Sequence, residues 1–137
     1  MYVDSIQNGV VIDHISAGGA MRLYNLLNLQ DFSFPVAMIT RVQSKKIGVK
    51  DIIKIDGDVS LNMDVIGYAE PGATINIIKD NELIEKKIMK LPERLVNVIR
   101  CNNPRCITSC EQELDQVFVL TDSARKVYRC LYCETKG

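Results

Sequence analysis

The most constraining feature of this sequence is a set of four cysteines near its C-terminus. Cys101 and Cys106 form a C-x4-C pair, and Cys130 and Cys133 form a C-x2-C pair. Two such pairs supply the four tetrahedral thiolate ligands that a structural Zn²⁺ site requires. Because four protein ligands leave no open position for water or substrate, we expect one structural Zn²⁺ that holds a small domain together.

Two disulfide bonds are the alternative interpretation of the same four cysteines. An odd fifth thiol at Cys110 and an N-terminus without the pattern of a secretory signal argue against it. Cys110 lies four residues after Cys106, and we expect a small buried side chain there rather than a metal ligand.

Charge and hydropathy narrow the class of protein. The 137 residues include 17 basic and 17 acidic side chains, and neither half of the chain carries the strong positive excess that drives phosphate-backbone binding. Hydrophobic runs are too short to span a bilayer. We therefore expect a cytoplasmic protein that binds neither nucleic acid nor membrane, although basic residues beside the cysteines keep a nucleic-acid-binding zinc ribbon as a rival hypothesis.

Catalytic chemistry has few candidate groups in this chain. His14 is the only histidine, there is no glycine-rich phosphate loop, and most thiols are committed to the metal pattern. A small enzyme is accordingly the weakest of the three hypotheses.

The N-terminal part alternates between strand and helix patterns. Residues 2–6 and 10–15 are predicted strands joined by a turn at Asn8-Gly9, and Ser16 is a predicted helix cap. The elements expected after it are a helix, strands over 36–42 and 49–55, a helix over 60–69, and strands over 74–78 and 83–89. This order predicts an α+β fold, with a ferredoxin-like sheet covered by two helices on one face, followed by a small all-β zinc-binding domain.

The strand over 49–55 separates two kinds of side chain. Alternation directs Lys50, Ile52 and Lys54 to one face, and Asp51, Ile53 and Ile55 to the core. Two lysines around an isoleucine on the open face suit an anion with an apolar body, such as a nucleotide. Taken alone, exposed strand lysines more often form a solvated face that discourages edge pairing, and a lone histidine such as His14 is more often structural.

Several segments together resemble one family, that of aspartate carbamoyltransferase regulatory chains. The segments that carry the resemblance are GVVIDHI at 9–15, KDIIKI at 50–55, LPER at 91–94, and the cysteine segments CNNPRCIT at 101–108 and CLYCE at 130–134. The resemblance runs through the whole chain in order. It implies a non-catalytic regulatory subunit of pyrimidine biosynthesis, with a nucleotide-binding allosteric domain over 1–94 and a structural zinc domain over 95–137 that contacts the catalytic chain.

The resemblance also implies ligands and residue roles. CTP would inhibit and ATP activate through one pocket. Ile6 would face the base, Asp13 and His14 would lie beside the nucleotide, and Lys50, Lys54 and Lys86 would contact the phosphates and ribose. Asn103 and Glu134 match positions that contact the catalytic chain. The family pairs regulatory chains through the N-terminal sheet, and three such pairs join two catalytic trimers. If the predicted register of this strand is wrong by one residue, Lys87 and not Lys86 lies on the nucleotide face.

Overall fold

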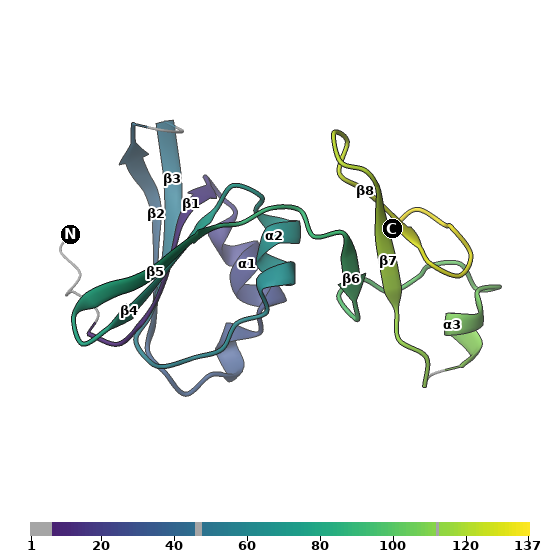
Figure 1. The fold of residues 1–137 in the computed structure, drawn as a ribbon, viewed down its shortest axis with the longest axis horizontal. Helices are drawn as coiled ribbons and strands as arrows, with labels where there is room; N and C mark the ends of the chain where they lie inside the picture. Colours follow the sequence, from purple (N-terminus) through teal and green to yellow (C-terminus); the bar gives the residue numbers. More distant parts are fainter. Residues whose placement is uncertain (1–6, 46–47, 112) are drawn as a thin grey trace. The chain divides into compact units, whose positions relative to one another are not determined.

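The computed structural model describes residues 7–45, 48–111 and 113–137 of the chain (Figure 1). These residues form two compact units, divided between Lys90 and Leu91, which are described separately. The predicted strand over 2–6, and Ile6 with it, lies outside the described residues. Among the described residues, no helix is long and apolar enough to cross a membrane.

The first unit contains a five-stranded antiparallel sheet in the order β2-β3-β1-β4-β5. Helices α1 and α2 cover one face of this sheet, and a short 3-10 helix, η1, follows α1 (Figure 1). The first four strands have the order and connections of the ferredoxin-like fold, so this prediction is confirmed, with β5 added at one edge. The bounds of the elements are β1 Gly9–Ser16, α1 Ala20–Leu26, η1 Leu29–Asp31, β2 Val36–Ser44, β3 Gly48–Ile55, α2 Met63–Ala69, β4 Thr74–Lys79 and β5 Glu82–Ile88.

The core of this unit lies between the sheet and the two helices. Its fully buried side chains include Ile12, Ile53 and Ile75 from β1, β3 and β4, and Leu23 and Ile66 from the helices. These three isoleucines are direct cross-strand neighbours, because Ile12 pairs with Ile53 on one side and with Ile75 on the other. Burial of such side chains is worth about 1.5–3 kcal/mol each. The three isoleucines therefore contribute much of the free energy of packing between the sheet and its helices.

The helix caps differ from the prediction at the first helix. Ser16 is the last residue of β1 and not a cap, since its Oγ donates to Glu70 Oε2 at 2.8 Å, and Gly19 takes the N-cap position of α1. A Cβ at Gly19 would overlap the Glu70 carboxylate, so a larger residue there would displace this side chain. The second helix starts at Met63 rather than at residue 60, with the Asn62 side chain accepting from the N–H groups of Asp64 and Val65.

The predicted alternation along β3 is confirmed. Ile53 and Ile55 are fully buried, while Lys50, Ile52 and Lys54 lie half-buried on the opposite, open face. Asp51 is also fully buried, and its carboxylate accepts hydrogen bonds from the backbone N–H groups of Gly18, Ala20 and Arg41 at 3.0, 3.2 and 3.1 Å. Asp51 therefore joins the β1–α1 turn and β2 across the middle of β3.

Both neighbours of β3 carry a one-residue bulge at the level of Asp51. On β1 the register shifts between Ile12 and Ile15, and on β2 it shifts between Ile39 and Val42. His14 and Arg41 take positive φ angles of 58° and 60° within these bulges. The first bulge keeps both Ile12 and Ile15 in the core and leaves Asp13 and His14 outside it.

The second unit contains a three-stranded antiparallel sheet in the order β6-β7-β8. Its elements are β6 Arg94–Val96, α3 Ile107–Cys110, β7 Val117–Asp122 and β8 Val127–Cys130. Leu95, Phe118 and Tyr128 form its buried apolar centre, and the Tyr128 hydroxyl donates to the Pro92 carbonyl at 2.6 Å. The unit is a small β domain as predicted, with one short helical turn, α3, directly after Cys106.

Candidate functional site

The open face of the first sheet brings two of the predicted lysines into one row. Strand register sets Lys54 opposite Val11, Val11 opposite Asn76, and Asn76 opposite Lys86. The row therefore crosses β3, β1, β4 and β5. With neighbouring strands about 4.8 Å apart, the Cα atoms of Lys54 and Lys86 are separated by about 14 Å. At this distance both long side chains can reach one ligand bound between them.

The register also assigns the faces of the adjacent lysines of β5. Lys86 is opposite Asn76 on the open face, and Lys87 is opposite Ile75, which is fully buried beneath the helices. Lys87 pairs with Glu85 at 3.2 Å. Over residues 7–45, 48–111 and 113–137, neither Lys54 nor Lys86 has an ion-pair partner. Both of these ammonium groups are available to an anion.

Lys50 and Asp13 form an ion pair at the bulge of β1. Lys50 Nζ lies 2.8 Å from Asp13 Oδ1, and the two side chains are only 14% and 21% exposed. Partial burial alone would raise the pKa of Asp13, but the hydrogen bond from Lys50 and the N–H of His14 hold this pKa below its ordinary value. Asp13 therefore fixes the position of Lys50 at the edge of the open face.

His14 follows Asp13 in the same bulge, and its Nδ1 lies 3.1 Å from Thr74 Oγ1. A hollow of about 520 Å³ adjoins it, lined by His14, Ser16, Ala17, Val49, Pro71 and Gly72. Five of the six residues predicted for the nucleotide are therefore described, on β1, β3 and β5, and Ile6 is not. Sequence reasoning missed Val11 and Asn76, although alternation along β1 and β4 would have placed both on the face that holds Lys54.

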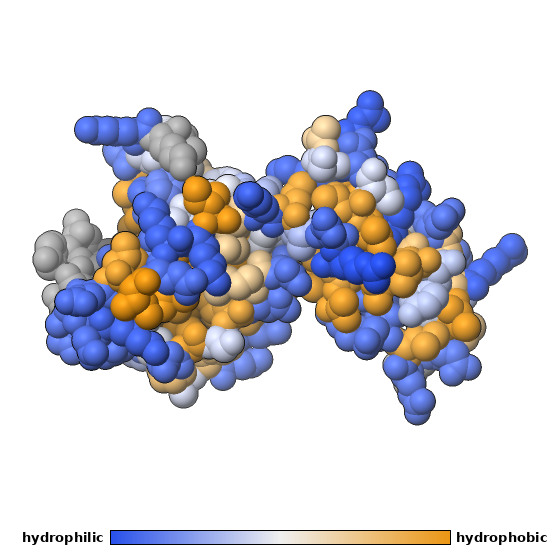
Figure 2. Space-filling view, viewed as in Figure 1, coloured by the Kyte–Doolittle hydropathy of each residue, from blue (hydrophilic) through white to orange (hydrophobic). Residues whose placement is uncertain are grey.

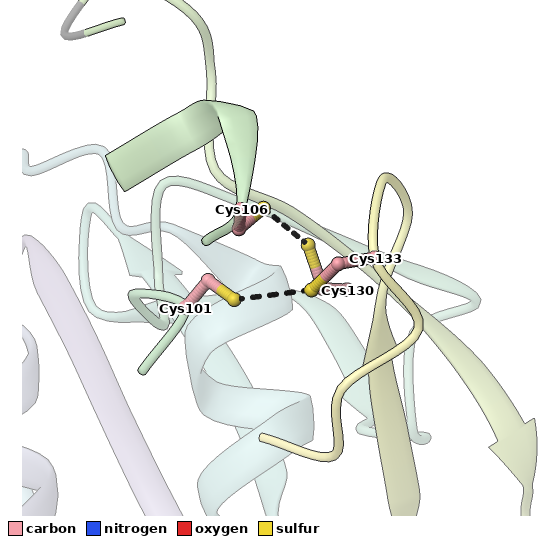
Figure 3. A group of neighbouring side chains, drawn as sticks. All are labelled: Cys101, Cys106, Cys130 and Cys133. Atoms are coloured by element: carbon pink, nitrogen blue, oxygen red, sulfur yellow. Dashed lines mark hydrogen bonds between the residues drawn. The ribbon is translucent and has the colours of Figure 1, made fainter. Parts of the chain in front are cut away.

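The four predicted zinc ligands converge in the second unit (Figure 3). Their four sulfur atoms lie within 4.8 Å of one another, with Cys101 and Cys133 3.5 Å apart and Cys106 and Cys130 3.7 Å apart. A tetrahedron with Zn–S bonds of about 2.3 Å has S···S edges of about 3.8 Å. All five cysteines are free thiols, so the disulfide alternative is not what the structure shows. The donor set and its spacing fit one structural Zn²⁺.

Cys110 does not join this cluster. It ends α3 and is exposed, so the expectation of a buried side chain was wrong. The residues after Cys106 form the single helical turn α3. Cys110 lies on its exposed side, and Thr108 lies on its buried side, toward the sulfurs.

The turns that hold the ligands are closed by backbone hydrogen bonds. In the first turn the N–H of Cys106 donates to the Asn103 carbonyl at 3.1 Å, and in the second the N–H of Glu134 donates to the Cys130 carbonyl at 2.9 Å. Glu134 takes a positive φ of 63° and is exposed, and Asn103 is half-buried. Both residues predicted to contact a partner thus belong to the zinc-binding turns.

Hydrogen bonds divide the thiols into two classes. Bonds from the hydroxyl and N–H of Thr108 lower the pKa of Cys106, and equivalent bonds from Thr135 lower the pKa of Cys133 to about 6. Burial raises the pKa of the Cys101 thiol to about 12. One sulfur of each turn therefore loses its proton more readily than an ordinary thiol does.

Gln116, the residue before β7, supports the first turn. Its Oε1 accepts from the Cys101 N–H at 3.0 Å, and its Nε2 donates to the Thr108 carbonyl at 3.3 Å. Asn97 holds Gln116 in turn, because its Oδ1 accepts from the Gln116 N–H at 2.9 Å. Gln116 thus bridges the two ends of the first cysteine turn, a role without a signal in the sequence pattern.

Large apolar side chains are exposed on the same turns. Ile107 is 51% exposed, Leu131 44% and Tyr132 45%. Figure 2 shows apolar and strongly polar side chains side by side on the surface of this unit. Such side chains next to a rigid metal site form a surface suited to protein docking.

Comparisons with known proteins agree with this geometry. The family model for the allosteric domain of the aspartate carbamoyltransferase regulatory chain matches residues 1–90, and that for its metal binding domain matches residues 93–137. The chain is 44% identical over 132 residues to the aspartate carbamoyltransferase regulatory chain of Clostridium acetobutylicum, covering 96% of this chain and 90% of that one. It is 42% identical over 137 residues to that of Bifidobacterium longum, covering 100% and 99%. The chain therefore belongs to the family of aspartate carbamoyltransferase regulatory chains, which are non-catalytic subunits.

Proposed function

We propose that the first unit binds CTP and ATP on the open face of its sheet, and that the zinc unit docks onto the catalytic chain of aspartate carbamoyltransferase. The two units would then be the nucleotide-binding and partner-binding domains of one regulatory subunit. The observation that carries the nucleotide assignment is the row of Lys54, Val11, Asn76 and Lys86, which sets two unpaired ammonium groups on either side of a half-buried centre.

The charges of this face suit a triphosphate. Lys54 and Lys86 are available to phosphate oxygens, and charge-assisted hydrogen bonds of this kind are about twice as strong as neutral ones. Lys50 adds a third ammonium group whose position Asp13 fixes at 2.8 Å. A preorganised cation loses little side-chain entropy when the phosphate arrives. In this proposal His14 lies at the phosphate end, beside the hollow of about 520 Å³.

The centre of the row suits the rest of the nucleotide. Val11 offers an apolar contact, and Asn76 offers both a donor and an acceptor from one amide group. The base would lie beyond them, toward the N-terminal segment that contains Ile6. Base discrimination would then depend mostly on backbone groups, because few polar side chains are near.

Docking of the zinc unit is supported by its exposed apolar side chains. Ile107 belongs to α3 after the first turn, and Leu131 and Tyr132 lie between the two cysteines of the second. Asn103 and Glu134, within the same turns, would supply polar contacts at the rim. Removal of the ion would unfold this surface, which makes docking depend on Zn²⁺.

Self-association of regulatory chains is supported by the edge of the first sheet. Strand β5 is an edge strand that exposes Leu83, Ile84 and Ile88, and Figure 2 shows apolar and polar side chains mixed over the β4–β5 hairpin. An exposed edge strand presents unpaired backbone N–H and C=O groups with which another chain can pair. Pairs of regulatory chains formed through the N-terminal sheet would link two catalytic trimers.

The mechanism we propose is linkage between two quaternary states. A nucleotide changes activity at a distant site only through its different affinity for the two states, a coupling typically worth about 1–3 kcal/mol. CTP would favour the state of low activity and ATP the state of high activity, and both would compete for the same face.

Two experiments test the two halves of this proposal. For nucleotide binding, CTP is titrated calorimetrically into the zinc-loaded chain and into its Lys54→Ala variant, and undiminished binding by the variant would remove the assignment of the open face. For docking, the zinc-loaded chain is mixed with the catalytic trimer of the same organism and analysed by size-exclusion chromatography with light scattering. We expect one large complex that a chelator dissociates. Two separate peaks with zinc confirmed in place would contradict the docking surface.

A further inference from the structure

Each cysteine turn contains the same short motif, in which its second cysteine is followed two residues later by a threonine. Thr108 follows Cys106, and Thr135 follows Cys133. The Thr108 Oγ1 lies 3.1 Å from the Cys106 sulfur, and the Thr135 Oγ1 lies 3.2 Å from the Cys133 sulfur. Two turns of different length therefore place a hydroxyl against one sulfur each.

The direction of these hydrogen bonds follows from the charge of the ligands. Zinc is bound by thiolates, which have no proton and can only accept hydrogen bonds. Each threonine hydroxyl must therefore donate to its sulfur once the metal is in place. Four thiolates around one Zn²⁺ carry a net double negative charge, and donated hydrogen bonds lower the charge density on the sulfurs.

Both threonines also hydrogen-bond protein groups other than the sulfurs. Thr108 is buried, and its carbonyl accepts from Gln116 Nε2 at 3.3 Å. The Thr135 carbonyl accepts from the Cys130 N–H at 2.9 Å, and the Thr135 Oγ1 accepts from Asn103 Nδ2 at 3.4 Å. A hydroxyl that already accepts from an amide directs its own proton toward the sulfur.

The first cysteine of each turn has no such donor. Over the described parts of the chain, the hydrogen-bond contacts of the Cys101 and Cys130 sulfurs include no threonine or serine hydroxyl, and the donor at Cys101 is the Asn103 backbone N–H. Cys130 is buried, whereas Cys101 is half-exposed. The site therefore has one sulfur, that of Cys101, that combines access with the lack of a hydroxyl donor.

We propose that Thr108 and Thr135 are positioning residues of the zinc site, whose hydroxyls donate to the bound thiolates of Cys106 and Cys133, retain the metal and protect both sulfurs from electrophiles. The Cys101 sulfur is then the first point of attack on the intact site. Residues that hydrogen-bond metal ligands typically contribute about 10- to 100-fold to metal affinity.

The test compares isosteric variants of the full-length, zinc-loaded chain. All carry Cys110→Ser, because Cys110 is an exposed thiol outside the site. Thr108→Val and Thr135→Val remove one hydroxyl and keep the backbone N–H, Thr135→Ser restores the hydroxyl, and Thr121→Val is the control on an exposed threonine of β7. The first measurement is the rate at which a chromogenic chelator takes up the zinc.

The second measurement is the order in which iodoacetamide modifies the cysteines, followed by peptide mass spectrometry. In this reaction a thiolate sulfur forms a bond to the carbon that carries iodine, the C–I bond breaks and iodide leaves, and the resulting thioether releases the metal. The parent chain should be modified first at Cys101. In Thr135→Val, modification at Cys133 should become at least as fast as modification at Cys101.

We expect zinc loss about 10-fold faster in Thr108→Val and Thr135→Val, a rate near that of the parent in Thr135→Ser, and no change in Thr121→Val. A Thr135→Val variant that keeps both the parent rate of zinc loss and the parent order of alkylation would overturn the proposal. So would a Thr135→Ser variant that loses zinc as fast as Thr135→Val. If buried Thr108→Val fails to fold, half-exposed Thr135 decides the question alone.

Discussion

The paired lysines of β5 allow the nucleotide proposal to be tested with a matched control from adjacent positions. Lys86→Met and Lys87→Met each remove one ammonium group and keep the apolar stem. Lys86 lies on the open face without an ion-pair partner among the described residues, whereas Lys87 lies on the opposite face beside Glu85. Both side chains are exposed, so neither change should alter folding by more than a few tenths of a kcal/mol.

The expected magnitude follows from one charge-assisted contact. A hydrogen bond to a charged group is worth about 1.5–3 kcal/mol, and each 1.4 kcal/mol corresponds to a factor of about ten in Kd. Because the side chain of Lys86 is exposed and screened by salt, the low end applies, and Lys86→Met should weaken CTP binding about 10-fold. Lys87→Met removes only a distant charge and should change Kd by less than about threefold.

Isothermal titration calorimetry of CTP into the zinc-loaded chain measures both constants, at low and at physiological salt. The difference between the two variants should shrink as salt rises, because the lost contact is electrostatic. Equal weakening by the two substitutions would mean a general charge effect rather than a contact. A stronger effect from Lys87→Met would mean that the ligand binds on the other face, and either result would refute the assignment.

Four further predictions concern stability and the metal. Chelation of zinc should remove the NMR signals of ordered residues in the second unit and leave those of the first unit, since only the second depends on the ion; loss of both sets would contradict it. Gln116→Ala should weaken zinc binding about 10-fold in a chelator competition, and an unchanged affinity would show that the bridge between the ends of the first turn is dispensable. Asp51→Asn turns one of the two accepting carboxylate oxygens into an NH2 donor that faces buried N–H groups. It should lower the free energy of unfolding of the first unit, measured by urea denaturation, by about 2–4 kcal/mol, and a loss under about 1 kcal/mol would show that the three hydrogen bonds are readily replaced. Because the folded state lowers the pKa of Asp13, its stabilising contribution is present above the unfolded pKa of about 3.9 and is lost as the pH falls through the folded value. Asp13→Asn should therefore reduce the fall in the free energy of unfolding at acid pH. An unchanged fall would show that Asp13 is not its cause.

The features that followed from the sequence are those set by local periodicity and by covalent spacing. Alternation along β3 correctly separated Lys54 from Ile53, because a strand has a side-chain period of two regardless of its partners. The cysteine spacing predicted the metal cluster because only a few backbone turns can direct two sulfurs to one point. The order of helices and strands then selected the fold class.

The features that were missed depend on contacts between distant segments. Ser16 looked like a helix cap, but the Glu70 carboxylate, far along the chain, hydrogen-bonds it at the end of β1 instead. The bulge at His14 needs a partner strand to exist and leaves no local pattern. Asp51 did carry a signal, since a carboxylate on the core face of a strand must find donors, but the donors could not be named before the turns were placed.

The β7–β8 hairpin has a consequence for how the second unit acquires its metal. Phe118 pairs with Cys130 in this hairpin, so contacts close in sequence deliver the last two ligands as a finished half-site. Hairpins of this kind form in about 1–10 μs, far faster than a trace metal can arrive by diffusion. The ion then has to recruit only the first turn, and closing the intervening loop costs little extra entropy for each added residue. Zinc binding and ordering of the first turn are thus the steps that complete the second unit.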